Sequence, residues 1–154
     1  MEACPYKKIY FNHTTKVAQK CIFCFPRIEK QVSNACARQC PGRVRFVGYR
    51  DDQNAPIYQL VEKWKAAIPL HPGFGTDPNV FYVPPLSPPK IDEAGGAMAE
   101  SRVPLDYLES LFGDGVSAAL ETITAERAKK AEGGESELMD TLIGYRHAEM
   151  FKLS

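Results

Sequence analysis

The pattern of apolar and polar positions predicts short strands near the start of the chain. Residues 9–12 and 16–18 resemble two short strands and flank the turn residues His13-Thr14-Thr15, as in a β-hairpin. Residues 43–47 alternate between polar and apolar side chains and predict a third short strand. We therefore expect residues 1–50 to consist of short strands joined by loops.

Helical spacing of apolar residues begins after residue 50. Residues 51–54 are turn-forming, and Pro56 suits the first position of a helix. The apolar positions that follow lie on one helical face: Ile57, Leu60, Val61, Trp64 and Ile68. The pattern predicts one helix within residues 51–68, with Trp64 packed in its core.

Three more short helices are predicted toward the end of the chain. The first runs from Pro104 to Phe112 and is stopped by Gly113. The second begins with Asp114 as its N-cap, ends before residues 133–134, and carries the apolar stripe Val116, Leu120 and Ile123. The third starts near Ser136 and carries apolar residues at 138, 139, 142 and 143.

Proline dominates the stretch between these helical regions. Residues 69–104 contain eight prolines, which exclude a regular helix or a central strand and predict an extended, polyproline-like arm. The arm is rich in aromatic and aliphatic side chains, so we expect it to lie against another surface. The sequence thus predicts an α+β chain with four parts: a module of short strands over 1–50, a helix over 51–68, an extended arm over 69–104, and a helical docking tail over 105–154.

Charge is divided unevenly along the chain although the net charge is zero. Residues 1–50 hold ten Lys and Arg against two Asp and Glu, and residues 51–154 hold nine against seventeen. The two parts therefore carry about +8 and −8. A basic segment suits nucleic acid, an acidic partner surface or a bound anionic cofactor. All five cysteines lie in the basic part, which favours the cofactor.

The cysteine spacing is that of a thiolate metal site. Cys21 and Cys24 form a C-x2-C pair, Cys36 and Cys40 form a C-x3-C pair, and Cys4 precedes them. Proline follows both Cys4 and Cys40. A proline directly after the last cysteine of a run is typical of ferredoxins, in which that cysteine binds the other cluster of a two-cluster module. The spacing indicates [4Fe–4S] clusters.

Three other uses of cysteine compete with the binding of iron–sulfur clusters. Zinc also favours C-x2-C pairs, but the remaining spacing and the Cys-Pro pairs are less typical of it. Disulfides are disfavoured by the odd number of cysteines. A catalytic thiol needs a base, and none of His13, His71 and His147 lies in a recognisable nucleophile motif.

Five cysteines cannot supply two clusters with four thiolates each. Either Cys21, Cys24, Cys36 and Cys40 bind one cluster and leave Cys4 unused, or some ligands lie outside this segment. Residues 2–5 look like the end of a longer cysteine run. We therefore expect that Met1 is not the natural start of the domain.

Several stretches of the chain are similar to one family. Residues 2–12 (EACPYKKIYFN), 20–29 (KCIFCFPRIE), 36–45, 81–89 (FYVPPLSPP) and 107–113 (YLESLFG) resemble the iron–sulfur beta subunits of molybdenum oxidoreductases. The nearest group is the type II DMSO-reductase family, which includes ethylbenzene dehydrogenase, dimethylsulfide dehydrogenase, selenate reductase and chlorate reductase. Respiratory nitrate reductase beta subunits are more distant cousins. The similarity covers nearly all of this chain but only the C-terminal part of the family's subunit.

The resemblance implies a set of cluster ligands. The family has one [3Fe–4S] and three [4Fe–4S] clusters in two pseudo-symmetric ferredoxin-like modules. By position, Cys21, Cys24 and Cys36 match three ligands of one [4Fe–4S] cluster, Cys40 matches the distant ligand of another, and Cys4 matches the last ligand of a third. The ligands of the [3Fe–4S] cluster fall before Met1, so that cluster is expected only in the full-length subunit.

The resemblance also implies partners and a compartment. It suggests a non-catalytic electron-transfer subunit that relays electrons between a molybdopterin catalytic (alpha) subunit and a haem b (gamma) subunit or membrane cytochrome. Residues 1–154 contain no apolar run of membrane-spanning length. The implied compartment is the periplasm, reached by export with the partner, or alternatively the cytoplasmic face of the membrane. The competing hypothesis is a zinc-stabilised binding module with a basic face, although the aromatic platform of a nucleic-acid reader is missing.

Overall fold

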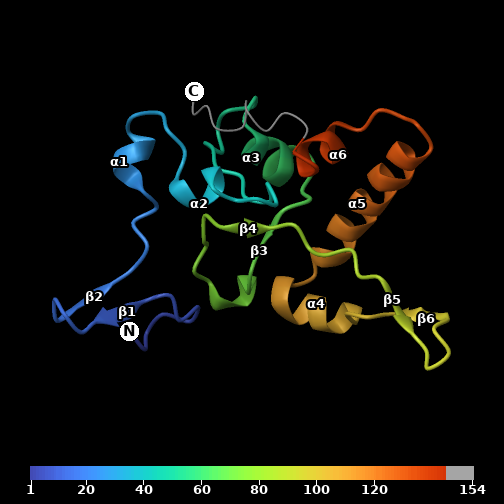
Figure 1. Cartoon of the computed structure of the whole chain (residues 1–154), viewed down its shortest axis with the longest axis horizontal. Helices are drawn as coiled ribbons and strands as arrows, with labels where there is room; N and C mark the ends of the chain where they lie inside the picture. Colours follow the sequence, from blue (N-terminus) through green and yellow to red (C-terminus); the bar gives the residue numbers. More distant parts are fainter. Residues whose placement is uncertain (145–154) are drawn as a thin grey trace.

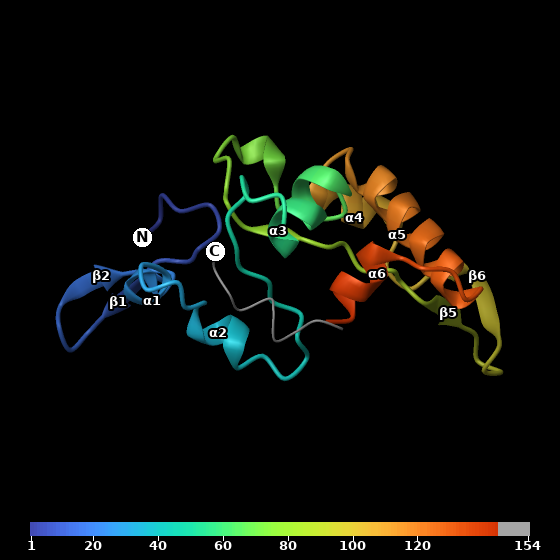
Figure 2. The same ribbon diagram turned by 90° about the horizontal axis from the view of Figure 1, so that it is seen from above.

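The computed structural model describes residues 1–144 as an elongated arrangement of short helices and three two-stranded antiparallel sheets. The β1–β2 hairpin lies at one end of the molecule and the β5–β6 hairpin at the other (Figure 1), and the view from above shows the same separation (Figure 2). The predicted mixture of helices and short strands is therefore confirmed. No helix among these residues is both long and apolar enough to cross a membrane.

Residues 1–50 form one hairpin and two single-turn helices. Strands β1 (Tyr10–Asn12) and β2 (Val17–Gln19) pair antiparallel, as predicted. Helices α1 (Phe25–Ile28) and α2 (Ala35–Arg38) follow. The predicted strand over residues 43–47 is wrong. These residues have no strand partner among the described residues, and Arg43 at their start adopts a left-handed backbone conformation (φ 51°) rather than an extended one.

The predicted helix after residue 51 is shorter than expected. Helix α3 (Pro56–Tyr58) continues into a π-helical turn, η1 (Gln59–Lys63), and Pro56 occupies the first turn as predicted. The helix ends there because Lys65 has a φ of 49° and the N–H groups of residues 66 and 67 both donate to the carbonyl of Leu60. Ile68, expected on the helical face, instead lies in strand β3 (Ile68–Pro69), which pairs with β4 (Phe81–Tyr82).

The proline-rich segment is folded into short pieces rather than one continuous arm. It contains β3, the 3-10 turn η2 (Pro72–Phe74), β4, and the hairpin of β5 (Pro89–Ile91) and β6 (Ala97–Ser101). The β5–β6 hairpin was not predicted, and an ion pair between Lys90 and Glu100 joins its strands. Phe81, Val83 and Leu86 pack against the core, which fits the expectation that this segment lies on another surface.

The C-terminal helices follow the prediction closely. Helix α4 (Leu105–Phe112) ends at Gly113, α5 (Val116–Ala131) ends before residues 133–134, and α6 (Glu137–Leu142) is capped by Ser136. The cap of α5 differs from the prediction, because Gly115 and not Asp114 occupies that position. The last ten residues of the predicted tail lie outside the described residues.

The hydrophobic core lies almost entirely after residue 59. One cluster joins the η1 turn to helices α5 and α6, and its buried members are Leu60, Ala66, Ala67, Ile123, Leu138 and Met139. A second cluster joins α4 to the start of α5 through Leu108, Phe112 and Val116. Trp64 packs, half-buried, against the first cluster, as predicted. Residues 1–50 contribute little buried apolar surface, so their loops are held mainly by hydrogen bonds and local turns.

Candidate metal centre

All five cysteines are free thiols at or near the surface of residues 1–50. Cys4, Cys24 and Cys40 are half-buried, whereas Cys21 and Cys36 are exposed. The described cysteines thus form no disulfide. Accessible, unpaired thiols in one basic segment are suited to binding a metal group.

The Cys4 and Cys40 turns share one backbone geometry. In each, the cysteine carbonyl accepts a hydrogen bond of 3.1 Å from the N–H of the residue three positions later, which is Lys7 in one turn and Arg43 in the other. Both basic residues adopt left-handed conformations, with φ values of 52° and 51°. A proline follows the cysteine in both turns. The two Cys-Pro segments are therefore structural copies of each other.

These turns direct backbone N–H groups at the cysteine sulfur. The N–H of Lys8 lowers the pKa of the Cys4 thiol, and the N–H groups of Tyr6 and Lys7 and the Lys7 charge add to the shift against a raising effect of burial. The N–H of Val44 likewise lowers the pKa of the Cys40 thiol, with further lowering by nearby N–H groups and by the Arg45 charge. Both turns thus favour the thiolate, which is the form that binds metal.

The C-x2-C pair is shaped by the start of helix α1. The N–H of Phe23 donates to the sulfur of Cys21 at 3.3 Å. Phe23 and Cys24 both have positive φ values, and Cys24 occupies the N-cap of α1. Three of the five sulfurs therefore face backbone N–H donors. This donor set fits an anionic thiolate cluster, whose charge such donors stabilise.

Cys36 lies in the first turn of helix α2. The buried side chain of Asn34 caps this helix by accepting a hydrogen bond of 3.2 Å from the N–H of Ala37. The loop before the cap is held by Arg27, whose Nε donates to the carbonyl of Ser33 at 3.2 Å. A capped single turn therefore fixes the backbone from which the exposed Cys36 thiol projects.

The structure places the cysteines in separate turns rather than around one point. Among the described residues, no group of three or more Cys, His, Asp or Glu side chains is arranged to hold a metal ion. Cys21, Cys24, Cys36 and Cys40 are therefore not gathered as a single site in this arrangement. Which cysteines share a cluster stays a prediction. His147, weighed as a base from the sequence, lies outside the described residues.

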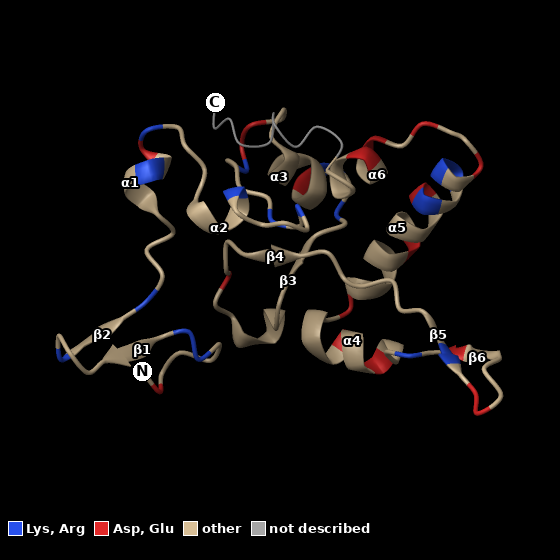
Figure 3. Ribbon diagram, in the orientation of Figure 1, with Lys and Arg blue, Asp and Glu red and all other residues tan. Residues whose placement is uncertain are grey.

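The cations around these turns are largely unneutralised. Of the ten Lys and Arg in residues 1–50, only Arg50 forms an ion pair with another described residue, through Glu62 at 2.6 Å. Figure 3 shows Lys and Arg spread along the cysteine-bearing part, whereas Asp and Glu lie mainly on η1, α4, α5, α6, the loop between α5 and α6, and the β5–β6 hairpin. The cysteine turns thus carry positive charge that a bound anion or an acidic surface can compensate.

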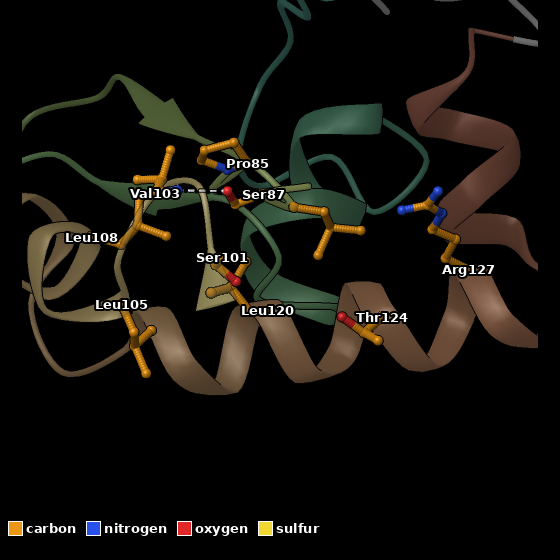
Figure 4. A pocket seen from close by; sticks show the side chains of 10 residues that line it. Pro85, Ser87, Ser101, Val103, Leu105, Leu108, Leu120, Thr124 and Arg127 are labelled. Carbon is orange, nitrogen blue, oxygen red and sulfur yellow. Dashed lines mark hydrogen bonds between the residues drawn. The ribbon is translucent and has the colours of Figure 1, made fainter. Parts of the chain in front are cut away.

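A pocket of about 420 Å³ lies far from this charge, among α4, α5 and the base of the β5–β6 hairpin (Figure 4). Its wall is mainly leucine and valine, and the hydroxyl of Ser87 accepts a hydrogen bond of 2.7 Å from the N–H of Val103 within it. No cysteine lines this pocket. It is therefore separate from the candidate metal centre.

Sequence reasoning missed the duplicated turn. Lys7 and Arg43 were counted only among the ten cations of residues 1–50, and the two Cys-Pro segments were not related to each other. The signal was present as Cys-Pro-x-Lys at residues 4–7 and Cys-Pro-x-Arg at residues 40–43. The shared turn was not predicted, because it requires a left-handed conformation at Lys7 and Arg43. That conformation is uncommon for residues other than Gly, Asn and Asp.

Turns that favour the thiolate, and cations that form no ion pair with a described residue, fit the class of iron–sulfur proteins. Residues 1–50 match the family described as "4Fe-4S dicluster domain". This match favours iron–sulfur clusters over zinc. Over nearly its whole length the chain is also a relative of molybdenum-oxidoreductase beta subunits, so the resemblance inferred from the sequence is confirmed.

Three of these relatives are between 48% and 64% identical to the chain. The beta subunit of dimethylsulfide dehydrogenase from Rhodovulum sulfidophilum is 64% identical over 152 residues, which cover 99% of this chain and 47% of that subunit. The beta subunit of chlorate reductase from Ideonella dechloratans is 51% identical over 98% of this chain and 47% of its own length. The beta subunit of respiratory nitrate reductase from Haloferax mediterranei is 48% identical over 94% and 43%. The chain spans about half the length of the curated relatives it matches.

Proposed function

We propose that the chain transfers electrons through [4Fe–4S] clusters as part of the beta subunit of a molybdenum oxidoreductase. The observation that carries this proposal is the duplicated Cys-Pro turn, whose backbone N–H groups lower the pKa of the Cys4 and Cys40 thiols. The similarity to beta subunits of named oxidoreductases supports the same function. The chain performs no bond-making step of its own in this proposal.

A bound cluster supplies a one-electron carrier, and the residues of the chain set its environment. The five thiolates hold iron, and the N–H groups of the turns stabilise the negative charge on sulfur. The unpaired cations of residues 1–50 favour the more negative, reduced state. The protein therefore controls the reduction potential by charge, hydrogen bonding and exposure to water.

The proposed ligand assignment follows the resemblance. Cys21, Cys24 and Cys36 bind one [4Fe–4S] cluster, Cys40 binds a second, and Cys4 binds a third. Each cluster is completed by ligands outside this segment, and a [3Fe–4S] cluster belongs to the full-length subunit only. The separate turns that carry Cys4 and Cys40 support the assignment of these two cysteines to different clusters. The two copied turns around Cys4 and Cys40 support the ferredoxin-like, pseudo-symmetric arrangement.

The proposed partners are a molybdopterin catalytic subunit and a haem b subunit or membrane cytochrome. The basic surface of residues 1–50 is suited to an acidic docking face, since nine of its cations form no ion pair with a described residue. Such complementarity mainly speeds and orients association. We place the assembly in the periplasm, after export with the catalytic partner.

Metal analysis of the protein purified without oxygen tests this function. In the full-length subunit, iron and acid-labile sulfide should both be present in multi-atom amounts, and dithionite reduction should give the electron paramagnetic resonance signals of [4Fe–4S] clusters. Replacement of all five cysteines by serine is the control and should remove the [4Fe–4S] signals together with the iron and sulfide that belong to them. Colourless protein with stoichiometric zinc would instead establish the zinc-stabilised binding module.

A further inference from the structure

A pocket of about 400 Å³ lies directly against the Cys4 turn. Cys4 and Lys8 form one side of it. The other side comes from the proline-rich segment, and we call its four side chains the aromatic wall: His71, Phe74, Val80 and Tyr82. The half-buried Cys4 thiol therefore faces an apolar, aromatic surface that is distant in sequence.

Tyr6, two residues after Cys4, fixes the wall to the cysteine turn. Its hydroxyl donates to the carbonyl of Leu70 at 3.1 Å and shares a hydrogen bond of 2.7 Å with the hydroxyl of Thr76. Its ring lies 5.8 Å from the ring of Phe74, centroid to centroid. Phe74 in turn stacks on His71 at 4.7 Å. The Tyr6 side chain is thus hydrogen-bonded to both ends of the loop over residues 70–76, which contains η2.

The wall is also attached to the folded core. The N–H of His71 donates to the carbonyl of Leu111 in helix α4, at 2.6 Å. Tyr82 pairs with Ile68 in the β3–β4 sheet and lies 6.4 Å from the ring of Phe112. The wall is therefore held from two sides, by the Cys4 turn and by the core of the C-terminal helices.

The copied turn at Cys40 lacks this attachment. Gly42 stands where the Cys4 turn has Tyr6, so no side chain at that position can reach another segment. The backbone around the two sulfurs is otherwise the same, with equal hydrogen bonds of 3.1 Å. The difference between the turns is thus confined to what covers the sulfur, and Cys40 serves as an internal comparison for Cys4.

We propose that the pocket is the chamber of the cluster bound by Cys4, that the aromatic wall shields this cluster from water, and that Tyr6 is the positioning residue that holds the wall in place. The inference rests on the proposed function and extends it by giving the proline-rich segment a role at one cluster. A four-thiolate cluster gains negative charge on reduction, and water stabilises added charge. Removal of the wall therefore favours the reduced state and raises the midpoint potential of that cluster alone.

The first test needs no cluster. In the full-length subunit freed of its metal, alkylation by iodoacetamide is followed at each cysteine by peptide mass spectrometry. Phe74→Ala should increase the rate at Cys4 severalfold and leave Cys40 unchanged. Tyr6→Phe keeps the ring but removes both hydrogen bonds, and it should give a smaller increase. Tyr107→Ala, which removes an exposed aromatic side chain of α4 outside the pocket, is the matched control and should change neither rate.

The second test uses the assembled, cluster-bearing protein. Cys4→Ser identifies the cluster signal that depends on Cys4, and a redox titration of Phe74→Ala should shift that signal to higher potential while the others stay in place. An unchanged Cys4 alkylation rate in Phe74→Ala would refute the proposal that the pocket is the chamber of this cluster. An equal shift in the midpoint potential of every cluster would refute it as well. Should no cluster depend on Cys4, the proposed ligand role fails, and the alkylation rates still decide whether the wall covers the thiol.

Discussion

The N–H of His71 donates a hydrogen bond of 2.6 Å to the carbonyl oxygen of Leu111, and so joins the segment facing Cys4 to the last turn of helix α4. Carbonyl groups in the last turn of a helix lack partners within the helix. Here the N–H of His71, in the proline-rich segment, is the hydrogen-bond partner of the Leu111 carbonyl. Packing at the end of α4 is thus connected, through this segment, to the candidate metal centre.

Gly113 is expected to be intolerant of a side chain because it ends α4 beside this segment. Its φ is 73°, and an added Cβ would approach Cγ of Pro72 to 2.9 Å. Gly113→Ala should therefore lower the free energy of unfolding by about 1–3 kcal/mol. Urea denaturation followed by circular dichroism measures the change.

Gly115→Ala is the matched control for that experiment. Gly115 has a φ of −71°, and nothing lies within 4 Å of the position of an added Cβ. Its substitution should change the free energy of unfolding by less than about 0.5 kcal/mol. Equal destabilisation by both substitutions would show that the contact with Pro72 does not matter.

Ser136 is expected to stabilise the last described helix and its connection to α5. Its buried hydroxyl accepts from the N–H of Met139 at 3.2 Å and donates to the carboxylate of Glu126 at 2.6 Å. Ser136→Ala should cost about 1–2 kcal/mol, because it removes a helix cap and leaves buried polar groups without a partner. Ser110→Ala, on the exposed face of α4, should cost nothing measurable in the same urea titration. A stability loss at Ser110 equal to that at Ser136 would rule out the capping explanation.

Local residue types made the C-terminal helices predictable. A glycine after Phe112 and a serine before residue 137 act through their own backbone neighbours, so helix ends could be placed without the fold. The end of the η1 turn was not predictable in this way, because Leu60 accepts the N–H groups of residues 66 and 67. The β5–β6 hairpin was not predicted, because proline usually argues against a strand. Proline is nevertheless tolerated at the first residue of a strand, which is where Pro89 lies in β5.

The candidate site was predictable in its chemistry but not in its geometry. Cysteine spacing and the Cys-Pro pairs predicted iron–sulfur chemistry, which the match of residues 1–50 to a 4Fe-4S dicluster domain supports. The hydrogen bonds of Tyr6 join residues separated by 64 and 70 positions, and no local pattern encodes such contacts. The sequence therefore named the thiolates but not the surface that covers one of them.

The β5–β6 hairpin should respond to acid through one carboxylate. The hydrogen bond from Lys90, together with its charge, lowers the pKa of Glu100. Because the pKa is lower in the folded state, the contribution of this pair to stability is complete above the unfolded pKa of about 4.3 and is lost as the pH falls through the folded pKa. Lys90→Met should raise the pKa of Glu100 toward its ordinary value, as measured by a carboxyl ¹³C titration. Lys63→Met, which removes a separate ion pair with Glu137, should leave the Glu100 titration unchanged.

Serine substitutions of single cysteines should separate the clusters and test the ligand assignment. Cys24→Ser and Cys36→Ser should remove the same [4Fe–4S] signal from the assembled subunit, because both residues are assigned to one cluster. Cys40→Ser should remove a different signal, since Cys40 lies in a turn of its own and matches the ligand of another cluster. Cys24→Ser should also weaken assembly with the catalytic partner, because an empty loop no longer fixes the basic surface around it.

Electron paramagnetic resonance at graded potentials distinguishes the signals. Loss of the same signal in Cys24→Ser and Cys40→Ser would favour a single cluster held by Cys21, Cys24, Cys36 and Cys40, and retention of every signal in Cys24→Ser would refute its ligand role.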